Sequence, residues 1–107
     1  MKQLCHINDI NDGQSKGFEI DGEFIFAVKK GQDIFVYKNA CPHLGIQLEW
    51  QPDQFLDDQN QFIQCSMHGA LFNIHNGECI FGPCQGDSLI SLETSIIDDK
   101  LCIQDDA

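Results

Sequence analysis

The segment Cys41-Pro42-His43 is followed, after 21 intervening residues, by Cys65-Ser66-Met67-His68-Gly69. Each segment offers one cysteine thiolate and one histidine imidazole at short spacing. Together they supply four ligands of two chemical kinds, which is enough for one metal centre. The proline in the first segment and the glycine that ends the second favour tight loops. The sequence therefore predicts a metal site built from two loops, with the ligands Cys41, His43, Cys65 and His68.

These loops resemble the cluster-binding loops of the Rieske 2Fe-2S family. Residues 39–45 match the first loop, residues 65–72 match the second, and Gly82-Pro83-Cys84 matches the Gly-Pro loop that covers the cluster. In that family two cysteines hold one iron and two histidines hold the other. The resemblance implies that Cys41 and Cys65 bind the inner iron, and that His43 and His68 bind the outer iron near the solvent. It covers roughly residues 1 to 104, and it is strongest to the small ferredoxins of ring-hydroxylating dioxygenase systems.

The resemblance also indicates a low reduction potential within the Rieske range. The high-potential branch, found in respiratory bc complexes, has a disulfide between the two loops, where this chain has Ile46 and Met67. That branch also has hydroxyl donors to the cluster where this chain has Ala70 and Phe72. We therefore expect a midpoint near the lower end of a range of about −150 to +300 mV.

A zinc site is the alternative use of the same four ligands. Two cysteines and two histidines also suit tetrahedral zinc, but zinc fingers usually have a cysteine pair followed by a histidine pair. The two mixed pairs of this chain favour the iron-sulfur interpretation. A zinc-stabilised binding module remains as a further hypothesis.

The other cysteines and histidines are predicted to have no ligand role. Three cysteines lie in apolar strand-like runs, where cysteine behaves as a small buried hydrophobe: Cys5, Cys79 and Cys102. Cys84 is expected to pack within the Gly-Pro loop. His6 has no partner at ligand spacing, and His75 precedes the turn signal Asn76-Gly77, so His75 is expected to face solvent.

The chain is strongly acidic. It has 17 Asp and Glu against six Lys and no Arg, and its net charge is −11. From Asn39 to Asp99 there are nine carboxylates and no Lys or Arg. This charge disfavours nucleic acid and anionic membrane surfaces as partners, and it favours a cationic protein surface. Four acids are expected to steer such a partner toward the site: Glu49, Asp53, Asp57 and Asp58.

No membrane or secretion signal is apparent in the sequence. No apolar run of signal-peptide length follows Met1-Lys2, and the longest uninterrupted apolar stretch, Phe24 to Val28, is too short to span a bilayer. We expect a cytoplasmic protein with no membrane partner, in which the cysteines stay reduced.

The length and the apolar pattern predict one all-β domain over residues 1–107, a Rieske-like antiparallel sandwich or barrel. A small cluster-binding subdomain, about 41–81, is expected as an insertion, with Trp50, Phe55 and Leu56 packed beneath the loops. Alternation predicts that Phe24, Phe26 and Val28 share one face of a half-buried strand, and that Leu101 and Ile103 share another. No helix is predicted. Turn signals, among them Asp21-Gly22 and Asp98-Asp99, separate the predicted strands. These strands cover residues 3–7, 24–29, 33–38, 61–64, 71–74, 78–81, 89–97 and 100–104.

The predicted function is electron transfer and not catalysis. After His43 and His68 are assigned to a cluster, only His6 and His75 remain, too few for the two-histidine iron site of an oxygenase. The first hypothesis is a stand-alone ferredoxin that passes single electrons from a flavin-dependent reductase to a terminal oxygenase. Both partners would dock over the His43/His68 face, formed with Pro42, Leu44, Gly69 and Gly82-Pro83. The second hypothesis is a small subunit or regulatory redox module of a larger enzyme such as nitrite reductase.

Overall fold

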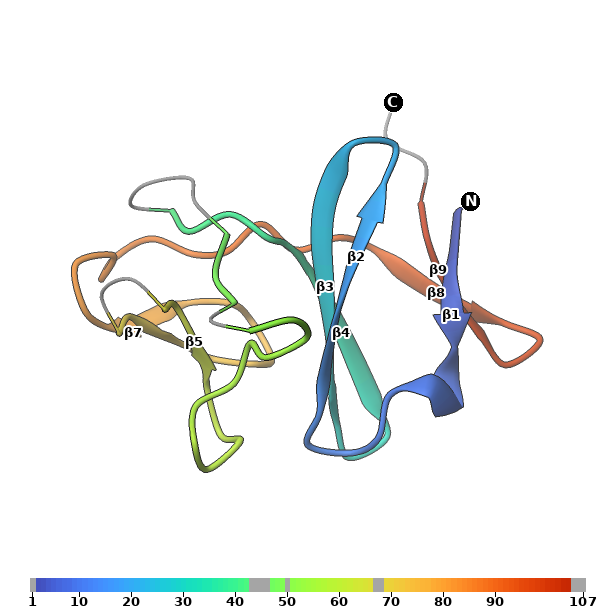
Figure 1. Cartoon of the computed structure of the whole chain (residues 1–107), viewed down its shortest axis with the longest axis horizontal. Coiled ribbons are helices and arrows are strands. Elements are labelled where there is room, and N and C mark those ends of the chain that lie inside the picture. The colour runs from blue at the N-terminus through green and yellow to red at the C-terminus, as the bar shows by residue number, and fades with distance from the viewer. Residues whose placement is uncertain (1, 43–46, 50, 67–68, 105–107) are drawn as a thin grey trace.

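The computed structural model describes residues 2–42, 47–49, 51–66 and 69–104. In this part of the chain nine strands pair antiparallel in three sheets of three strands each (Figure 1). The first sheet has the order β1-β9-β8, with β1 Lys2–His6, β8 Thr94–Ile97 and β9 Lys100–Ile103. The second has the order β2-β3-β4, with β2 Ser15–Ile20, β3 Glu23–Lys30 and β4 Asp33–Lys38. The third has the order β5-β6-β7, with β5 Ile63–Gln64, β6 Leu71–Phe72 and β7 Cys79–Phe81.

The second sheet lies between the other two (Figure 1). We call the first and second sheets the base. We call the third sheet, with the described residues from Asn39 to Leu89, the small lobe. The all-β antiparallel fold predicted from the sequence is confirmed.

Two of the hairpins turn at the predicted residues. Asp21-Gly22 joins β2 to β3, and Asp98-Asp99 joins β8 to β9. All four residues have positive φ, at 52° and 82° in the first turn and 52° and 62° in the second. Two-residue turns with both residues left-handed match the twist of the strands that they connect, and aspartate and glycine tolerate this conformation.

Strand β3 is buried on both faces, so the prediction of a half-buried strand was wrong. Ile25 and Ala27 belong to the apolar cluster of the base, whereas Phe26 and Val28 belong to the cluster shared with the small lobe. The small lobe covers the face that was predicted to be buried, and the rest of the base covers the opposite face, which we had expected to meet solvent. Phe24, at the beginning of the strand, is 44% exposed and does not share the burial of Phe26 and Val28.

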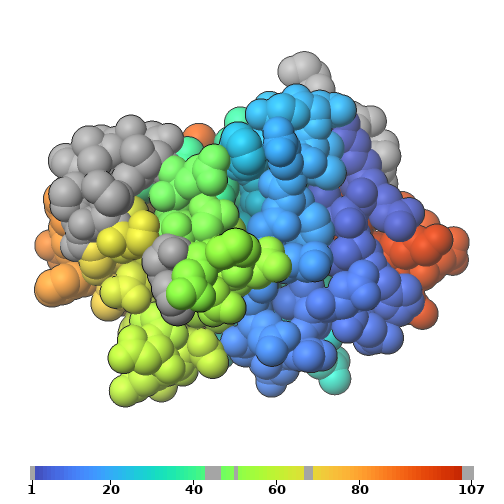
Figure 2. Space-filling view, viewed as in Figure 1, coloured from blue at the N-terminus to red at the C-terminus, as the bar shows by residue number. Residues whose placement is uncertain are grey.

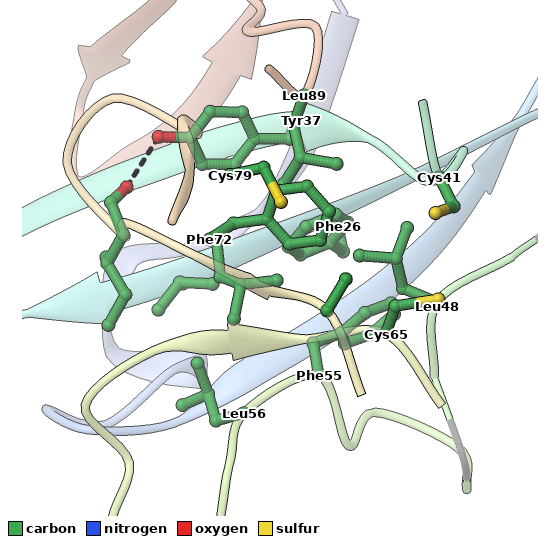
Figure 3. Packing of buried hydrophobic residues seen from close by; sticks show 14 of the residues in the cluster. Phe26, Tyr37, Cys41, Leu48, Phe55, Leu56, Cys65, Phe72, Cys79 and Leu89 are labelled. Carbon is green, nitrogen blue, oxygen red and sulfur yellow. Dashed lines mark hydrogen bonds between the residues drawn. The ribbon is translucent and has the colours of Figure 1, made fainter. Parts of the chain in front are cut away.

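The two apolar clusters use opposite faces of the central sheet. In the base cluster, Leu101 and Ile103 pack together as predicted. The other cluster joins the central sheet to the small lobe, and its labelled members are seen in Figure 3. Across the boundary Phe26 stacks on Phe55, with ring centroids 4.4 Å apart and an interplanar angle of 5°. Leu56 also lies in this cluster, as expected, and Trp50 lies outside the described residues.

Strand β2 was missed in the sequence. Its apolar residues Phe18 and Ile20 alternate, but Lys16 and Gly17 interrupt the pattern. The segment around residues 51–56 lies against this strand (Figure 2), where Asp53 Oδ1 accepts a hydrogen bond from the Gly17 amide at 2.8 Å. A Cβ on Gly17 would come within 3.2 Å of the Phe55 ring, so glycine permits this close approach.

Other elements differ from prediction mainly in extent. The run predicted as a strand over 89–97 is a strand only from Thr94, although Ile90 and Leu92 still form backbone hydrogen bonds with β4. Among the described residues the helical element is a short 3-10 turn, η1 Ile7–Asp9, and no helix there is long and apolar enough to cross a membrane. His6 begins this turn, and its Nδ1 accepts the Asn8 amide hydrogen at 3.1 Å.

Candidate metal centre

Cys41 lies in the loop after β4, and Asn39 fixes the two ends of that loop. The backbone amide of Asn39 donates to the Phe24 carbonyl at 2.9 Å, while the side-chain Oδ1 of Asn39 accepts the hydrogen of the Leu48 backbone amide at 2.7 Å. Its Nδ2 donates to Glu49 Oε1 at 2.9 Å. Since Asn39 and Leu48 flank the loop, these bonds hold its ends together. Cys41 is left with only 2% of its surface exposed.

Cys65 follows β5 and begins the second loop. Its amide donates to the Ala70 carbonyl at 2.9 Å, and the Gly69 amide donates to the Cys65 carbonyl at 3.1 Å, so the loop is closed on itself. The Ser66 amide donates to the Leu48 carbonyl at 3.0 Å. This bond ties the second loop to the first. The Cys65 side chain is 1% exposed.

The Gly82-Pro83-Cys84 segment packs directly on the second loop. Gly82 has a φ of +104°, and a Cβ on it would lie 2.9 Å from the Ala70 Cα. Only glycine permits that approach of one backbone to another without displacement. Cys84 is fully buried, and its Sγ lies 3.6 Å from the Cys41 Sγ. The three segments matched in the sequence therefore meet in space.

The described half of the predicted ligand set fits an iron-sulfur cluster. Cys41 and Cys65 both belong to the apolar cluster of the small lobe, and Figure 3 shows them on the same side of it, away from Tyr37. Two buried thiols on neighbouring loops are the donors that one iron of a mixed cysteine-histidine cluster requires. His43 and His68 lie outside the described residues. Among the described residues no group of three or more metal-ligating side chains converges, as expected when two of four ligands lie outside them.

Several predictions about neighbouring residues can be compared with the structure. Cys5, Cys79 and Cys102 are buried, as predicted, and His75 is exposed. Ala70 and Phe72 are buried in the same apolar cluster as Cys41 and Cys65. Leu44, Ile46 and Met67 lie outside the described residues.

Sequence reasoning missed the polar contacts that position the site. The role of Asn39 was not predicted. The signal for it was present, because an asparagine two positions before Cys41, at the start of a loop, often hydrogen-bonds to the loop backbone. The approach of Cys84 to Cys41 was also missed, because 43 positions separate them. Tyr37 is a third such residue. Its hydroxyl donates to the Ile74 carbonyl at 2.5 Å (Figure 3), and burial raises its pKa to about 12.

A family model for the Rieske [2Fe-2S] domain matches residues 1–95. The chain belongs to this family. The Rieske [2Fe-2S] cluster is accordingly its cofactor. The cytochrome b6-f complex iron-sulfur subunit of Chlorobaculum thiosulfatiphilum is 31% identical over an alignment of 94 residues, and the match covers 78% of this chain and 48% of that protein. This Rieske chain thus spans about half the length of that relative.

Solved structures of ferredoxins share the fold of this Rieske chain. The ferredoxin of Sphingomonas yanoikuyae B1 superposes with a TM-score of 0.76 at 23% identity, covering 97% of each chain. A structure of oxygenase and ferredoxin in complex, from carbazole 1,9a-dioxygenase, matches with a TM-score of 0.78 at 20% identity. That match covers 94% of this chain and 89% of the other.

Proposed function

We propose that Cys41, His43, Cys65 and His68 bind the 2Fe-2S cluster and that the chain carries single electrons from a reductase to an oxygenase. The observation that carries this proposal is the meeting of the two loops. Cys41 and Cys65, 24 positions apart, are both buried in one apolar cluster, and the Ser66–Leu48 hydrogen bond joins their loops. The match to the Rieske family over residues 1–95 supports it.

The surroundings of the two cysteines suit electron transfer. A 2Fe-2S cluster held by these residues accepts and releases one electron at a time. Burial of Cys41 and Cys65 excludes water from their sulfurs, and the hydrogen bonds of Asn39 and Ala70 fix the loops that carry them. Loops fixed in this way change little when the charge changes, which favours fast electron exchange.

The proposed potential is low within the Rieske range. Ala70 and Phe72 are buried in the same apolar cluster as Cys41 and Cys65, and neither side chain has a hydroxyl to donate to a sulfur of the iron-sulfur cluster. Hydrogen bonds to the sulfurs are one of the factors that set such potentials. We expect a midpoint nearer about −150 mV than about +300 mV.

The proposed docking surface is formed by His43 and His68 together with the Gly82-Pro83 loop. Its described part includes Pro83, which is exposed, and Phe81, which is 61% exposed. An apolar centre with an acidic surround suits a partner whose own surface is apolar and rimmed by basic side chains. The ferredoxin–oxygenase complex from carbazole 1,9a-dioxygenase supports an oxygenase as acceptor, since that ferredoxin has the same fold. A flavin-dependent reductase as donor is part of the proposal.

The proposal extends to domain organisation and compartment. We treat residues 1–107 as one Rieske domain. We extend the cluster-binding subdomain from about 41–81 to Leu89, because Cys84 and Leu89 belong to the same apolar cluster. A reducing, cytoplasmic location is supported by the cysteines, since no disulfide joins any of the six, all of which are described.

A subunit of a larger redox enzyme is the second candidate function. It is favoured by the cytochrome b6-f subunit, of which this chain matches 48%. The two functions differ in whether the protein leaves its partners between electrons. Gel filtration of native cell extract separates them, because a mobile carrier elutes near its mass of 12.1 kDa and a permanent subunit does not.

Replacement of the four ligands tests the site. The purified protein should contain two irons and two acid-labile sulfides per chain. Alanine at Cys41, His43, Cys65 or His68 should abolish the visible absorbance and the iron content, because each residue supplies one bond to iron. Cys102→Ser and His75→Ala are matched controls, since both residues are described and neither is in the proposed set. They should leave both readouts unchanged.

Two outcomes would contradict the proposal. A normal spectrum in Cys65→Ala would remove the ligand assignment. Stoichiometric zinc without iron in the protein purified without oxygen would favour the zinc-stabilised module.

A further inference from the structure

Cys84 lies against a proposed cluster ligand. Its Sγ is 3.6 Å from the Cys41 Sγ, within hydrogen-bond range for two sulfurs, and both side chains are buried. In the family resemblance this residue only follows the Gly-Pro pair, and the sequence predicted that it would simply pack. The structure instead places the Cys84 thiol within hydrogen-bond distance of the Cys41 sulfur.

The direction of this hydrogen bond follows from the proposed function, on which the inference rests. A cysteine bound to iron is a thiolate and has no proton to donate. If Cys41 is a ligand, the only proton in the pair is on Cys84. We propose that the Cys84 thiol donates an S–H···S hydrogen bond to the Cys41 ligand sulfur and thereby raises the reduction potential of the cluster.

The loop that carries Cys84 is held in place by its backbone. The Cys84 carbonyl accepts the Asp87 amide hydrogen at 2.9 Å, and the Asp87 carbonyl accepts the Cys79 amide hydrogen at 3.0 Å. Gln85 Nε2 donates to the Ile80 carbonyl at 3.1 Å. Together with the contact of Gly82 on Ala70, these bonds leave the Cys84 side chain little freedom to move away from Cys41.

The effect on potential has a definite sign. An added electron makes the ligand sulfurs more negative, so a donor to a ligand sulfur stabilises the reduced form more than the oxidised form. A bond of this strength changes the equilibrium constant for reduction by at most about tenfold, which corresponds to about 59 mV for one electron. Cys84 therefore partly replaces the hydroxyl donors that Ala70 and Phe72 do not supply.

The test is redox titration of three variants of the loaded protein. Cys84→Ala should lower the midpoint, and Cys84→Ser, which keeps a donor, should restore most of the loss. Cys79→Ala is the matched control. It removes a buried thiol from the same apolar cluster, but the Cys79 Sγ donates to the Phe81 carbonyl at 3.3 Å and not to a proposed ligand. Its midpoint should equal that of the unchanged protein.

A second readout separates hydrogen bonding from packing. The infrared S–H band that disappears in Cys84→Ser should move to lower frequency when the unchanged protein is reduced, because the acceptor sulfur becomes more negative. A band that does not move, or a midpoint of Cys84→Ala equal to that of Cys79→Ala, would overturn the inference.

The ligand variants distinguish failure of the inference from failure of the proposed function. If Cys41→Ala keeps its iron, the proposed ligand set is wrong. If Cys84→Ala loses its iron while the four ligand variants behave as proposed, Cys84 is needed to retain the cluster and not only to adjust its potential, which overturns the inference and leaves the proposed function standing.

Discussion

Asn39 is a buried polar residue whose side-chain amide both accepts and donates a hydrogen bond. It is 5% exposed, its Oδ1 accepts the Leu48 amide hydrogen, and its Nδ2 donates to Glu49. Residues 41 and 48 lie on the same loop, so Asn39 decides how that loop closes. A buried amide that loses its acceptor costs about 1–3 kcal/mol.

Asn39→Ala should therefore lower the thermal unfolding midpoint by several degrees and speed cluster loss. A change of 1 kcal/mol shifts the midpoint of a domain of this size by about 4–8 °C. Asn76→Ala is the control, since Asn76 Oδ1 also accepts an amide hydrogen, from Glu78 at 2.9 Å, but at the exposed surface. Water can replace that acceptor, so the thermal unfolding midpoint of Asn76→Ala should change less than that of Asn39→Ala. Equal losses in the two variants would contradict this role for Asn39.

The Gly-Pro loop and the residues after it contain two glycines, Gly82 and Gly86, whose replacement can be compared directly. Gly82 and Gly86 have nearly the same φ, +104° and +98°, so alanine at either position would have to adopt a φ that L residues rarely adopt. A Cβ on Gly82 would lie 2.9 Å from Ala70 Cα, whereas a Cβ on Gly86 would have nothing within 4 Å. Gly82→Ala should therefore lose its iron-sulfur cluster faster than Gly86→Ala at a fixed temperature, as measured by the bleaching of the visible absorbance. Equal bleaching rates would mean that the contact with Ala70 does not hold the loops.

Tyr37 links strand β4 of the base to the small lobe through its hydrogen bond to Ile74. Tyr37→Phe should lower stability at neutral pH by about 0.5–1.5 kcal/mol, measured as a lower thermal midpoint. Burial raises the Tyr37 pKa from 10.0 to about 12, so the folded state binds the phenol proton more tightly than the unfolded state. The resulting stability is present below pH 10 and is lost as the pH rises toward 12.

The difference between Tyr37→Phe and the unchanged protein should therefore narrow over this alkaline range. The titration can be read directly, because Tyr37 is the one tyrosine of the chain and its ionisation changes the ultraviolet absorbance. A tyrosine that ionises near pH 10 in the folded protein would contradict the prediction.

These elements also show what the sequence could predict. The hairpin turns at Asp21-Gly22 and Asp98-Asp99 and strand β4 depend on local chemistry and were predicted correctly. The ligand set also follows from a local pattern, and it stays a prediction. Strand β2 was missed because Gly17 interrupts its pattern, and the reason for that glycine is Phe55, which is distant in sequence. The double burial of β3 and the approach of Cys84 to Cys41 depend on which segments pack together, and no local pattern encodes that.

The positive charges of the protein are confined to one part of the fold. All six lysines lie in strands of the base, whereas residues 39–89 contain six carboxylates and no Lys or Arg. The end that is proposed to meet partners is therefore wholly acidic. Three of the four acids predicted to steer partners also hold the fold: Asp57 Oδ1 accepts amide hydrogens from Gln61 and Phe62, Asp53 Oδ1 accepts one from Gly17, and Glu49 binds Asn39.

Exposed acids without such a structural role are the better test of steering. Asp58 and Asp87 are exposed in the small lobe, and replacing both by Asn should slow electron transfer to a basic acceptor such as cytochrome c. The expected loss is on the order of twofold to fivefold at low salt, with a weaker dependence on ionic strength. Stopped-flow mixing of the reduced protein with the acceptor measures both. Asp98→Asn, in the distant β8–β9 turn, is the control, and an equal loss there would show that net charge and not its position matters.

Strand β3 has a consequence for how the molecule opens. Its side chains fill both apolar clusters, Ile25 and Ala27 on one side and Phe26 and Val28 on the other. A segment shared in this way cannot leave one cluster without disrupting the other, so the two halves should melt as one cooperative unit. The backbone amides of β3 should then be the slowest in the chain to exchange with deuterium, at the rate of global unfolding. Repair of a damaged cluster would then require either local opening of the three loops or loss of the entire fold.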